Sequence, residues 1–291
     1  MNIEPVDPPA SAIRRCVEAA LVEDLGEVGD LSAALVPRHA RATFAIVSRS
    51  SGVLAGTACA TECCAQVDPK LAVTWSLHDG GPLTSSTEVG RISGPLRSVL
   101  TAERSALNFL CRLSGIASLT RRYVDALGSY GHRTRILDTR KTTPGLRALE
   151  KAAVRAGGGH NHRFGLFDGV LVKDNHLAGI AIAEAVAQAR ARWPGRQVEI
   201  ECDRIEQVEE ACRAGASVVL LDNMSVAQVS ECVELVGGLR PDGSTLVEVS
   251  GGVTLESAPR YAAAGADLIS VGALTHSAPA LDLGLDLLGS E

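Results

Sequence analysis

A chain of 291 residues with 46% apolar side chains has enough material for two domains or one large barrel. Its net charge of −6 argues against nucleic acid as a general partner, and no apolar run reaches the length of a membrane span. Residues Met1–Ala10 lack a basic region followed by an apolar one, so we expect no secretory signal there. The eight cysteines are scattered without a C-x-x-C pair, which favours reduced thiols and a cytoplasmic location.

The first part of the chain mixes helices and strands without a regular order. A helix with an apolar period near 3.6 is expected from Ser11, a good N-cap residue, to Gly26. Three strand patterns and one further helix follow, the strands at 44–47, 71–77 and 89–92 and the helix at 58–67. This order predicts a separate α+β domain.

A long helical pattern begins after Pro95 and carries Arg104. An arginine on a helix is usually a solvated or ion-paired surface residue, so Arg104 has no special role on this evidence alone. Ser114 and Gly115 interrupt the apolar pattern, which makes Gly115 the candidate hinge. We therefore place a first domain at residues 1–115 and a second at 116–275.

Six short β-type runs follow Gly131, most of them separated by amphipathic helical stretches; the runs are 134–137, 169–172, 198–200, 218–221, 245–249 and 267–271. This repetition of strand and helix predicts a parallel sheet. No G-x-G-x-x-G sequence follows the first run, so an open dinucleotide-binding sheet is not supported.

Each run ends on a charged residue or a glycine turn. Because the active sites of parallel barrels lie at the carboxyl ends of the strands, the pattern predicts a closed α/β barrel with a site at its mouth. Only six strands are visible, fewer than the eight of the common barrel. The strand-end residues are Asp138 to Lys141, Lys173, Glu201, Asp222, Ser250 to Gly252, and Gly272 with Ala273.

The residues at this mouth are of three chemical kinds. Arginine, lysine and histidine suit an anion with several carboxylates or phosphates, and are found at Arg140, Lys141, His162, Arg163 and Lys173. Glu201 and Asp222 are hard ligands of the sort that hold Mg²⁺ or accept from sugar hydroxyls. The glycine turns on the last two strands offer backbone N–H groups to a phosphate. Together they indicate a phosphorylated sugar beside a carboxylated partner.

Three other readings stay open at this point. His160, His162 and His176 are spaced loosely for zinc, without cysteine partners. Lys173 at a strand end could form a Schiff base, as lysines in barrel aldolases do. Glu201 and Asp222 could pair with Lys173 and Arg140 in an ion-pair network that has no catalytic role.

These motifs, in order, resemble the quinolinate phosphoribosyltransferases, the carboxylating nicotinate-nucleotide pyrophosphorylases. The resemblance runs from about residue 20 to 288 and includes both domains. It is found at residues 23–26, 29–32, 103–108, 138–145, 157–163, 173–176, 201–203, 221–224, 250–252 and 270–277.

The resemblance implies an N-terminal α/β sandwich, an irregular six- or seven-stranded parallel α/β barrel, and a C-terminal segment, 276–291, that packs back on the first domain. It also implies a homodimer with sites shared between subunits, so that Arg104 would reach into the neighbour's site; further assembly is left open. Quinolinate and phosphoribosyl pyrophosphate are the implied substrates, with nicotinate mononucleotide, pyrophosphate and CO₂ as products in NAD biosynthesis.

The resemblance also implies roles for single residues. Quinolinate would lie against Arg104, Thr139, Arg140, Lys141, His162, Arg163 and Lys173. Phosphoribosyl pyrophosphate would contact Glu201, Asp222, Ser250, Gly251, Gly252, Val271, Gly272 and Ala273. Glu201 and Asp222 would face Mg²⁺, directly or through other groups, and the catalytic residues would be Lys141, Lys173, Glu201 and Asp222. A Schiff-base lyase and a re-purposed relative without this activity are the competing hypotheses.

Overall fold

The computed structural model describes residues 8–290, which divide into two compact units. The first contains residues up to Arg121, then Thr142–Gly158, and the chain from Leu274 onward. The second contains Arg122–Lys141 and Gly159–Ala273. The expectation about a secretory signal rests mainly on residues 1–7, which lie outside the described residues.

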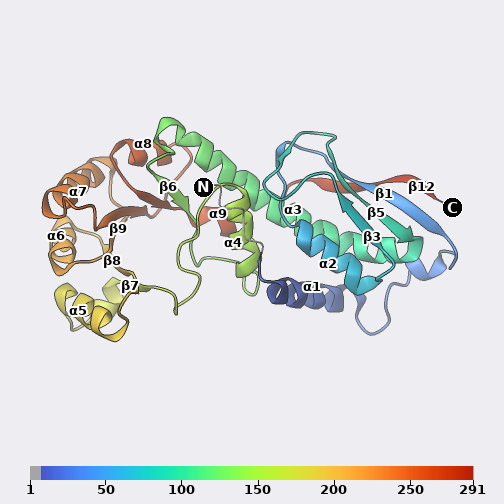
Figure 1. The fold of residues 1–291 in the computed structure, drawn as a ribbon, viewed down its shortest axis with the longest axis horizontal. Helices are drawn as coiled ribbons and strands as arrows, with labels where there is room; N and C mark the ends of the chain where they lie inside the picture. Colours follow the sequence, from blue (N-terminus) through green and yellow to red (C-terminus); the bar gives the residue numbers. More distant parts are fainter. Residues whose placement is uncertain (1–7, 291) are drawn as a thin grey trace. The chain divides into compact units, whose positions relative to one another are not determined.

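The first unit is an α/β sandwich around a four-stranded antiparallel sheet with the order β12-β1-β5-β3 (Figure 1). β1 is central because β12 pairs along one side of it and β5 along the other. A two-stranded sheet of β2 and β4 completes the strands of this unit. The strands are β1 (Arg41–Ser48), β2 (Gly52–Val53), β3 (Ala72–Trp75), β4 (Pro82–Leu83), β5 (Glu88–Pro95) and β12 (Leu283–Ser290).

The helices of this unit bury small aliphatic side chains and thiols. In α2 every fully buried residue is an alanine or a cysteine, which lets this helix pack closely on α1 and β3. The helices are α1 (Ala10–Leu25), η1 (Ala33–Leu35), α2 (Thr57–Val67), α3 (Leu96–Ala126, whose last five residues belong to the second unit) and α4 (Arg147–Ala156).

The second unit is a curved barrel of six parallel strands in the order β6-β11-β10-β9-β8-β7, with helices on its outside (Figure 1). Its strands are β6 (Arg135–Leu137), β7 (Val170–Val172), β8 (Val198–Cys202), β9 (Val218–Asp222), β10 (Leu246–Ser250) and β11 (Leu268–Ser270). Its helices are η2 (Gly128–Tyr130), η3 (Asp174–Leu177), α5 (Ile182–Arg192), α6 (Ile205–Ala214), α7 (Val226–Leu239) and α8 (Ala258–Ala263), and the short α9 (Ala273–His276) leads back to the first unit.

The barrel is less regular than the closed form expected from the sequence. Beyond β6 the described strands continue only as a single parallel bridge between Leu137 and His160. The segment that leads to β7 forms a turn instead of a strand, because the Asp168 carboxylate accepts from the backbone N–H groups of Phe164 and Gly165 at 2.6 and 2.9 Å. The prediction of a closed ring was wrong on this side.

Two local expectations were also wrong. Ser11 lies inside α1, whose N-cap is Pro9, because the Pro9 carbonyl accepts the first helical bond from Ala12 at 2.8 Å. The interruption expected at Ser114 and Gly115 is absent, because α3 runs unbroken through both residues. A Cβ on Gly115 would lie 2.0 Å from the carbonyl oxygen of Pro279, so the glycine permits the close approach of residues 279–280 to the helix.

We therefore expect Gly115→Ala to destabilise the protein, by about 1–3 kcal/mol, through overpacking in a buried contact. Gly237→Ala is the matched control, because Gly237 also lies in a helix, α7, and a Cβ there meets nothing within 4 Å. The control should stabilise by roughly 0.5–1 kcal/mol. Denaturant unfolding of both variants tests this, and equal effects of the two would contradict the close-approach explanation.

Among the elements that the sequence did not predict are α4 and β12. α4 lies in a stretch, Thr142–Gly158, that belongs to the first unit, although the sequence placed it with the barrel. β12 was expected only as a segment that packs back, and it is a full edge strand on β1. Among the helices of residues 8–290, none has the length and apolar character needed to cross a membrane.

Candidate active site at the strand ends

A row of polar side chains lies at the carboxyl ends of β7 to β10. The pairing of β7 with β8 brings Lys173 beside Glu201, and their side chains form an ion pair. Ser250 at the end of β10 is paired in register with Asp222 at the end of β9. Parallel strands end at a common edge, so a cation, two carboxylates and a hydroxyl face the same side of the barrel.

The buried carboxylate of Asp138 ties the end of β6 to residues 161 and 162. This carboxylate accepts from the Asn161 side chain at 2.5 Å and from the backbone N–H of His162 at 2.9 Å. Thr139 adds a tight turn, because its hydroxyl accepts from the Lys141 N–H at 3.0 Å. The loop that carries Arg140 and Lys141 is thereby anchored next to His162.

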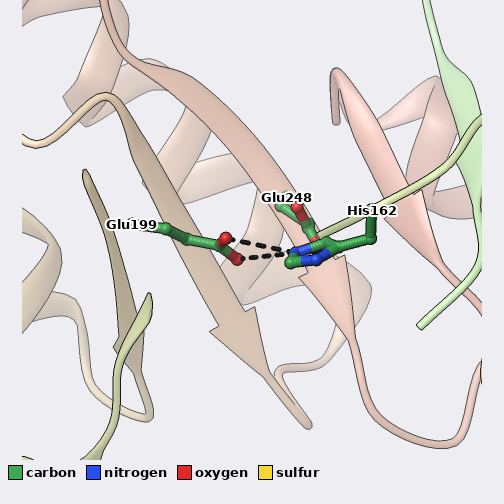
Figure 2. Close-up of side chains that lie close together, drawn as sticks. All are labelled: His162, Glu199 and Glu248. Atoms are coloured by element: carbon green, nitrogen blue, oxygen red, sulfur yellow. Dashed lines mark hydrogen bonds and ion pairs between the residues drawn. The ribbon is translucent and has the colours of Figure 1, made fainter. Parts of the chain in front are cut away.

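His162 lies inside the barrel between two glutamates of the strands (Figure 2). Its Nε2 is 3.1 Å from a carboxylate oxygen of Glu199 and 3.5 Å from one of Glu248. The three side chains are only 11, 6 and 2% exposed. Glu248 also accepts from the Ser270 hydroxyl at 2.5 Å. Two carboxylates and one imidazole therefore share a nearly dry site.

Burial and charge shift the titration of this group. Burial, then the neighbouring charge of Glu199, raises the pKa of Glu248 to about 7. Burial alone would lower the pKa of His162, but the hydrogen bond to Glu199 and the charges of the two glutamates outweigh it and raise that pKa. The cluster of His162, Glu199 and Glu248 therefore binds at least one proton more tightly than the same three side chains would in water.

The side chain of Arg163 lies next to Gly169, the residue that precedes β7. Its guanidinium donates to the carbonyl of Gly169 at 3.3 Å, and its Nε is buried without a hydrogen-bond partner among the described residues. Burial lowers the pKa of Arg163, although the acids Glu199 and Asp168 act against this shift. A buried N–H with no partner is suited to a ligand that brings an acceptor.

The glycine turn after β10 is interlocked with the turn after β9. Gly251 has φ +91°, and a Cβ there would lie 2.2 Å from the side-chain oxygen of Asn223. Asn223 itself adopts φ +56°, donates its backbone N–H to Ser250 at 3.0 Å, and donates its amide to Asp222 at 2.9 Å. This places a tight backbone turn beside the carboxylate of Asp222.

The other expected phosphate contacts are less uniform. The backbone N–H of Val271 donates to Leu137 at 2.9 Å as part of the strand pairing, so it is not available to a phosphate. Gly272 and Ala273 follow at the start of α9.

Arg104 lies in the first unit, on α3, with an exposed side chain.

The histidines do not form the zinc site considered from the sequence. Among residues 8–290, the histidine, cysteine, aspartate and glutamate side chains that come together with metal-like spacing are His162, Glu199 and Glu248. The Nδ1 of His176 instead accepts from the Lys173 N–H at 2.9 Å. The ion pair between Lys173 and Glu201 is present, as the non-catalytic reading also expected.

Comparison with known proteins places these features in one family. Residues 30–114 match the model of the N-terminal domain of quinolinate phosphoribosyl transferase, and residues 116–286 match that of its C-terminal domain. The chain belongs to the quinolinate phosphoribosyl transferase family. The phosphoribosyltransferase reading of the strand-end motifs is thereby confirmed.

Relatives in this family cover nearly the whole chain. It is 41% identical over 280 residues to the nicotinate-nucleotide pyrophosphorylase [carboxylating] of Mycobacterium leprae, covering 95% of this chain and 97% of the relative. It is 39% identical to a probable enzyme of the same name from Bacillus subtilis, with 94 and 93% covered. The solved NadC of Streptococcus pyogenes superposes with a TM-score of 0.90 at 40% identity, with 98% of this chain and 99% of that chain covered.

Glu199 and Glu248 lie beside the candidate site of this family member, and the sequence prediction missed both. Both stand inside short apolar runs, Val198–Cys202 and Leu246–Ser250, where an acid is unusual. Alternation along a strand puts Glu199 on the same face as Glu201, and that was the available signal. Their mutual proximity depends on the curvature of the barrel, which the sequence does not display.

Proposed function

We propose that this chain transfers the phosphoribosyl group of phosphoribosyl pyrophosphate to quinolinate, with loss of CO₂, to give nicotinate mononucleotide and pyrophosphate for NAD biosynthesis. The observation that supports this most is the strand-end arrangement. A cationic wall from the β6 loop, the 162–163 segment and Lys173 meets carboxylates at the ends of β8 and β9. An anionic aromatic acid and a sugar phosphate require these two kinds of surface.

The cationic wall suits quinolinate, which carries two carboxylates. Guanidinium groups bind carboxylates with two parallel hydrogen bonds, and ammonium groups add charge without a fixed direction. The buried Nε of Arg163 supplies a donor directed away from bulk water. We assign Thr139, Arg140, Lys141, His162, Arg163 and Lys173 to this pocket.

The carboxylate side suits the ribose and its pyrophosphate. Glu201 and Asp222 provide the oxygen ligands that Mg²⁺ prefers, and they sit on adjacent strands. Bound there, directly or through water, Mg²⁺ would neutralise charge on the departing pyrophosphate. The turn at Ser250, Gly251 and Gly252 would offer backbone N–H groups to the phosphate, together with Gly272 and Ala273, which follow β11.

The reaction then needs little covalent chemistry from the protein. The lone pair of the pyridine nitrogen forms a bond to C1′ of the ribose while the bond from C1′ to the pyrophosphate oxygen breaks. Glu201 and Asp222 stabilise the positive charge that develops at C1′. The new pyridinium accepts electron density, so the bond to the adjacent carboxylate breaks, CO₂ leaves, and the ring carbon takes a proton. We assign Lys141 and Lys173 to the stabilisation of the transient carbanion.

We further infer a homodimer in which Arg104 of one subunit completes the quinolinate pocket of the other. Arg104 lies on α3 of the first unit with its side chain exposed, in a segment that resembles the family at residues 103–108. We place the enzyme in the cytoplasm, in keeping with the eight cysteines, which form no disulfide bond among the described residues.

The direct test is incubation of the full chain with quinolinate, phosphoribosyl pyrophosphate and Mg²⁺. We expect nicotinate mononucleotide and CO₂ in equal amounts, and we expect EDTA in excess of Mg²⁺ to lower the rate by about 100-fold or more. Turnover of nicotinate in place of quinolinate would contradict the substrate assignment. Covalent trapping of a carbonyl substrate on Lys173 by borohydride would favour a lyase, although the Lys173 ammonium is here ion-paired to Glu201 and a Schiff base needs a neutral amine.

A further inference from the structure

The buried cluster of His162, Glu199 and Glu248 has no part in the function proposed so far beyond the histidine itself. Figure 2 shows the imidazole edge directed at both carboxylates, which come from two strands that are not neighbours, β8 and β10. A cavity of roughly 280 Å³ adjoins it, lined by strand starts of the barrel and by the three side chains. Two buried acids placed this way are costly unless a positive charge or a shared proton compensates them.

We propose that Glu199 and Glu248 are positioning residues that hold His162, a residue of the proposed quinolinate pocket, as an imidazolium. The inference rests on the proposed function for its ligand, and on the geometry of the cluster for its residues. Glu199 fixes the ring through Nε2 at 3.1 Å, and Glu248, held by Ser270, adds negative charge 3.5 Å away.

Several other charged groups lie close to this cluster. Besides the two glutamates, Arg163 is the adjacent cation, Arg135 and His160 line the same cavity, and the Asp138 carboxylate accepts from the backbone of His162. Arg163 disfavours a charge on His162, and both glutamates favour it. Two carboxylates close to the ring and nearly free of water outweigh one guanidinium.

One contact opposes the second proton on the ring. The backbone N–H of Arg163 lies 2.6 Å from Nδ1 of His162, so in this geometry Nδ1 accepts and Nε2 carries the hydrogen. Protonation of Nδ1 gives up this contact and frees a donor for a substrate carboxylate. A single contact with a neutral N–H is weaker than a charge-assisted hydrogen bond to the buried Glu199, which favours the cationic ring.

The same atoms could be read as a metal site, and the hydrogen bonds argue against it. Nε2 is engaged by Glu199, and an oxygen of Glu248 is engaged by Ser270. A proton therefore already occupies the space between the imidazole and the carboxylate. A metal ion bound by these three side chains is one outcome that the experiment below would detect.

The test is the titration of His162 in the full chain by NMR of ¹³C-labelled histidine, with the signal assigned by loss in His162→Asn. We expect the wild-type ring to titrate above the ordinary value near 6.5, and Glu199→Gln to lower this midpoint by about one unit or more. Glu199→Asp should restore part of the shift. Glu209→Gln is the matched control, because Glu209 is an exposed acid on α6 paired with Arg213, and it should leave the midpoint unchanged.

The pH dependence of kcat/KM for quinolinate would not shift if the two glutamates only stabilised the fold. A raised folded pKa means that the imidazolium is present below that pKa and is lost as pH rises through it, so kcat/KM for quinolinate should fall there. In Glu199→Gln this fall should move to lower pH, with KM at pH 7.5 raised about tenfold and kcat changed less. A uniform loss of activity at every pH would overturn the proposal.

Two further outcomes are decisive. A stoichiometric metal ion in the purified protein that disappears in Glu199→Gln would replace the proton with a metal and overturn the proposal. A His162 midpoint that Glu199→Gln leaves unchanged would do the same. The test distinguishes failure of this proposal from failure of the proposed function. If quinolinate is not turned over but the His162 midpoint moves as expected, the role of the two glutamates stands and the substrate assignment fails.

Discussion

Replacing Gly251 by alanine should lower kcat/KM for phosphoribosyl pyrophosphate by about 100-fold or more, with little change in the KM for quinolinate. Gly251 adopts φ +91°, which costs a residue with a Cβ of order 1 kcal/mol or more. The added Cβ would also lie 2.2 Å from the Asn223 side chain, which donates to Asp222. Relief of that clash displaces both the phosphate turn and the carboxylate proposed to face the ribose. Steady-state kinetics with each substrate varied in turn measures it.

Gly252→Ala is the matched control for this prediction. Gly252 also has a positive φ, +57°, but a Cβ there meets nothing within 4 Å. It should therefore show only the backbone strain, with an effect nearer tenfold. If the two variants were equally impaired, the contact between the two turns would have no special role, and the KM for quinolinate would show whether the damage is global.

The barrel could be predicted because its parallel strands are buried on both faces, under helices outside and against one another inside. Such strands appear in the sequence as short apolar runs. Short apolar runs followed by charged residues gave β6 to β11 within two residues at each end. The strand-end rule then collected most candidate residues before any geometry was known.

The misses have a common physical cause, which is dependence on a distant partner. α4 buries two charged residues completely, Glu150 and Lys151, so its buried face is not purely apolar. Glu150 is tolerated because Arg112 and Thr143 donate to its carboxylate at 2.8 Å each. β12 is weak as a strand in sequence and is stabilised by pairing with β1, more than 230 residues earlier. Neither partner is visible from local sequence.

The expected result for the shared site is a recovery of activity when two inactive variants are combined. Arg104→Ala and Lys173→Ala should each lose roughly 100-fold or more in kcat/KM, because each removes a cation from the pocket of a dianion. In a heterodimer of the two, one pocket would combine an intact barrel with an intact Arg104, and the other would lack both cations. Random pairing in equal amounts should therefore restore about a quarter of the wild-type rate.

The control is a mixture of Lys173→Ala with Arg140→Ala, two changes on the same barrel unit. Heterodimers of that pair have a damaged barrel in every site, so no recovery is expected. Differently tagged subunits, purified through both tags, establish that heterodimers have formed. If such heterodimers of Arg104→Ala and Lys173→Ala remain as inactive as the control, Arg104 serves its own barrel and each site is complete within one chain, because complementation requires that the two residues come from different subunits.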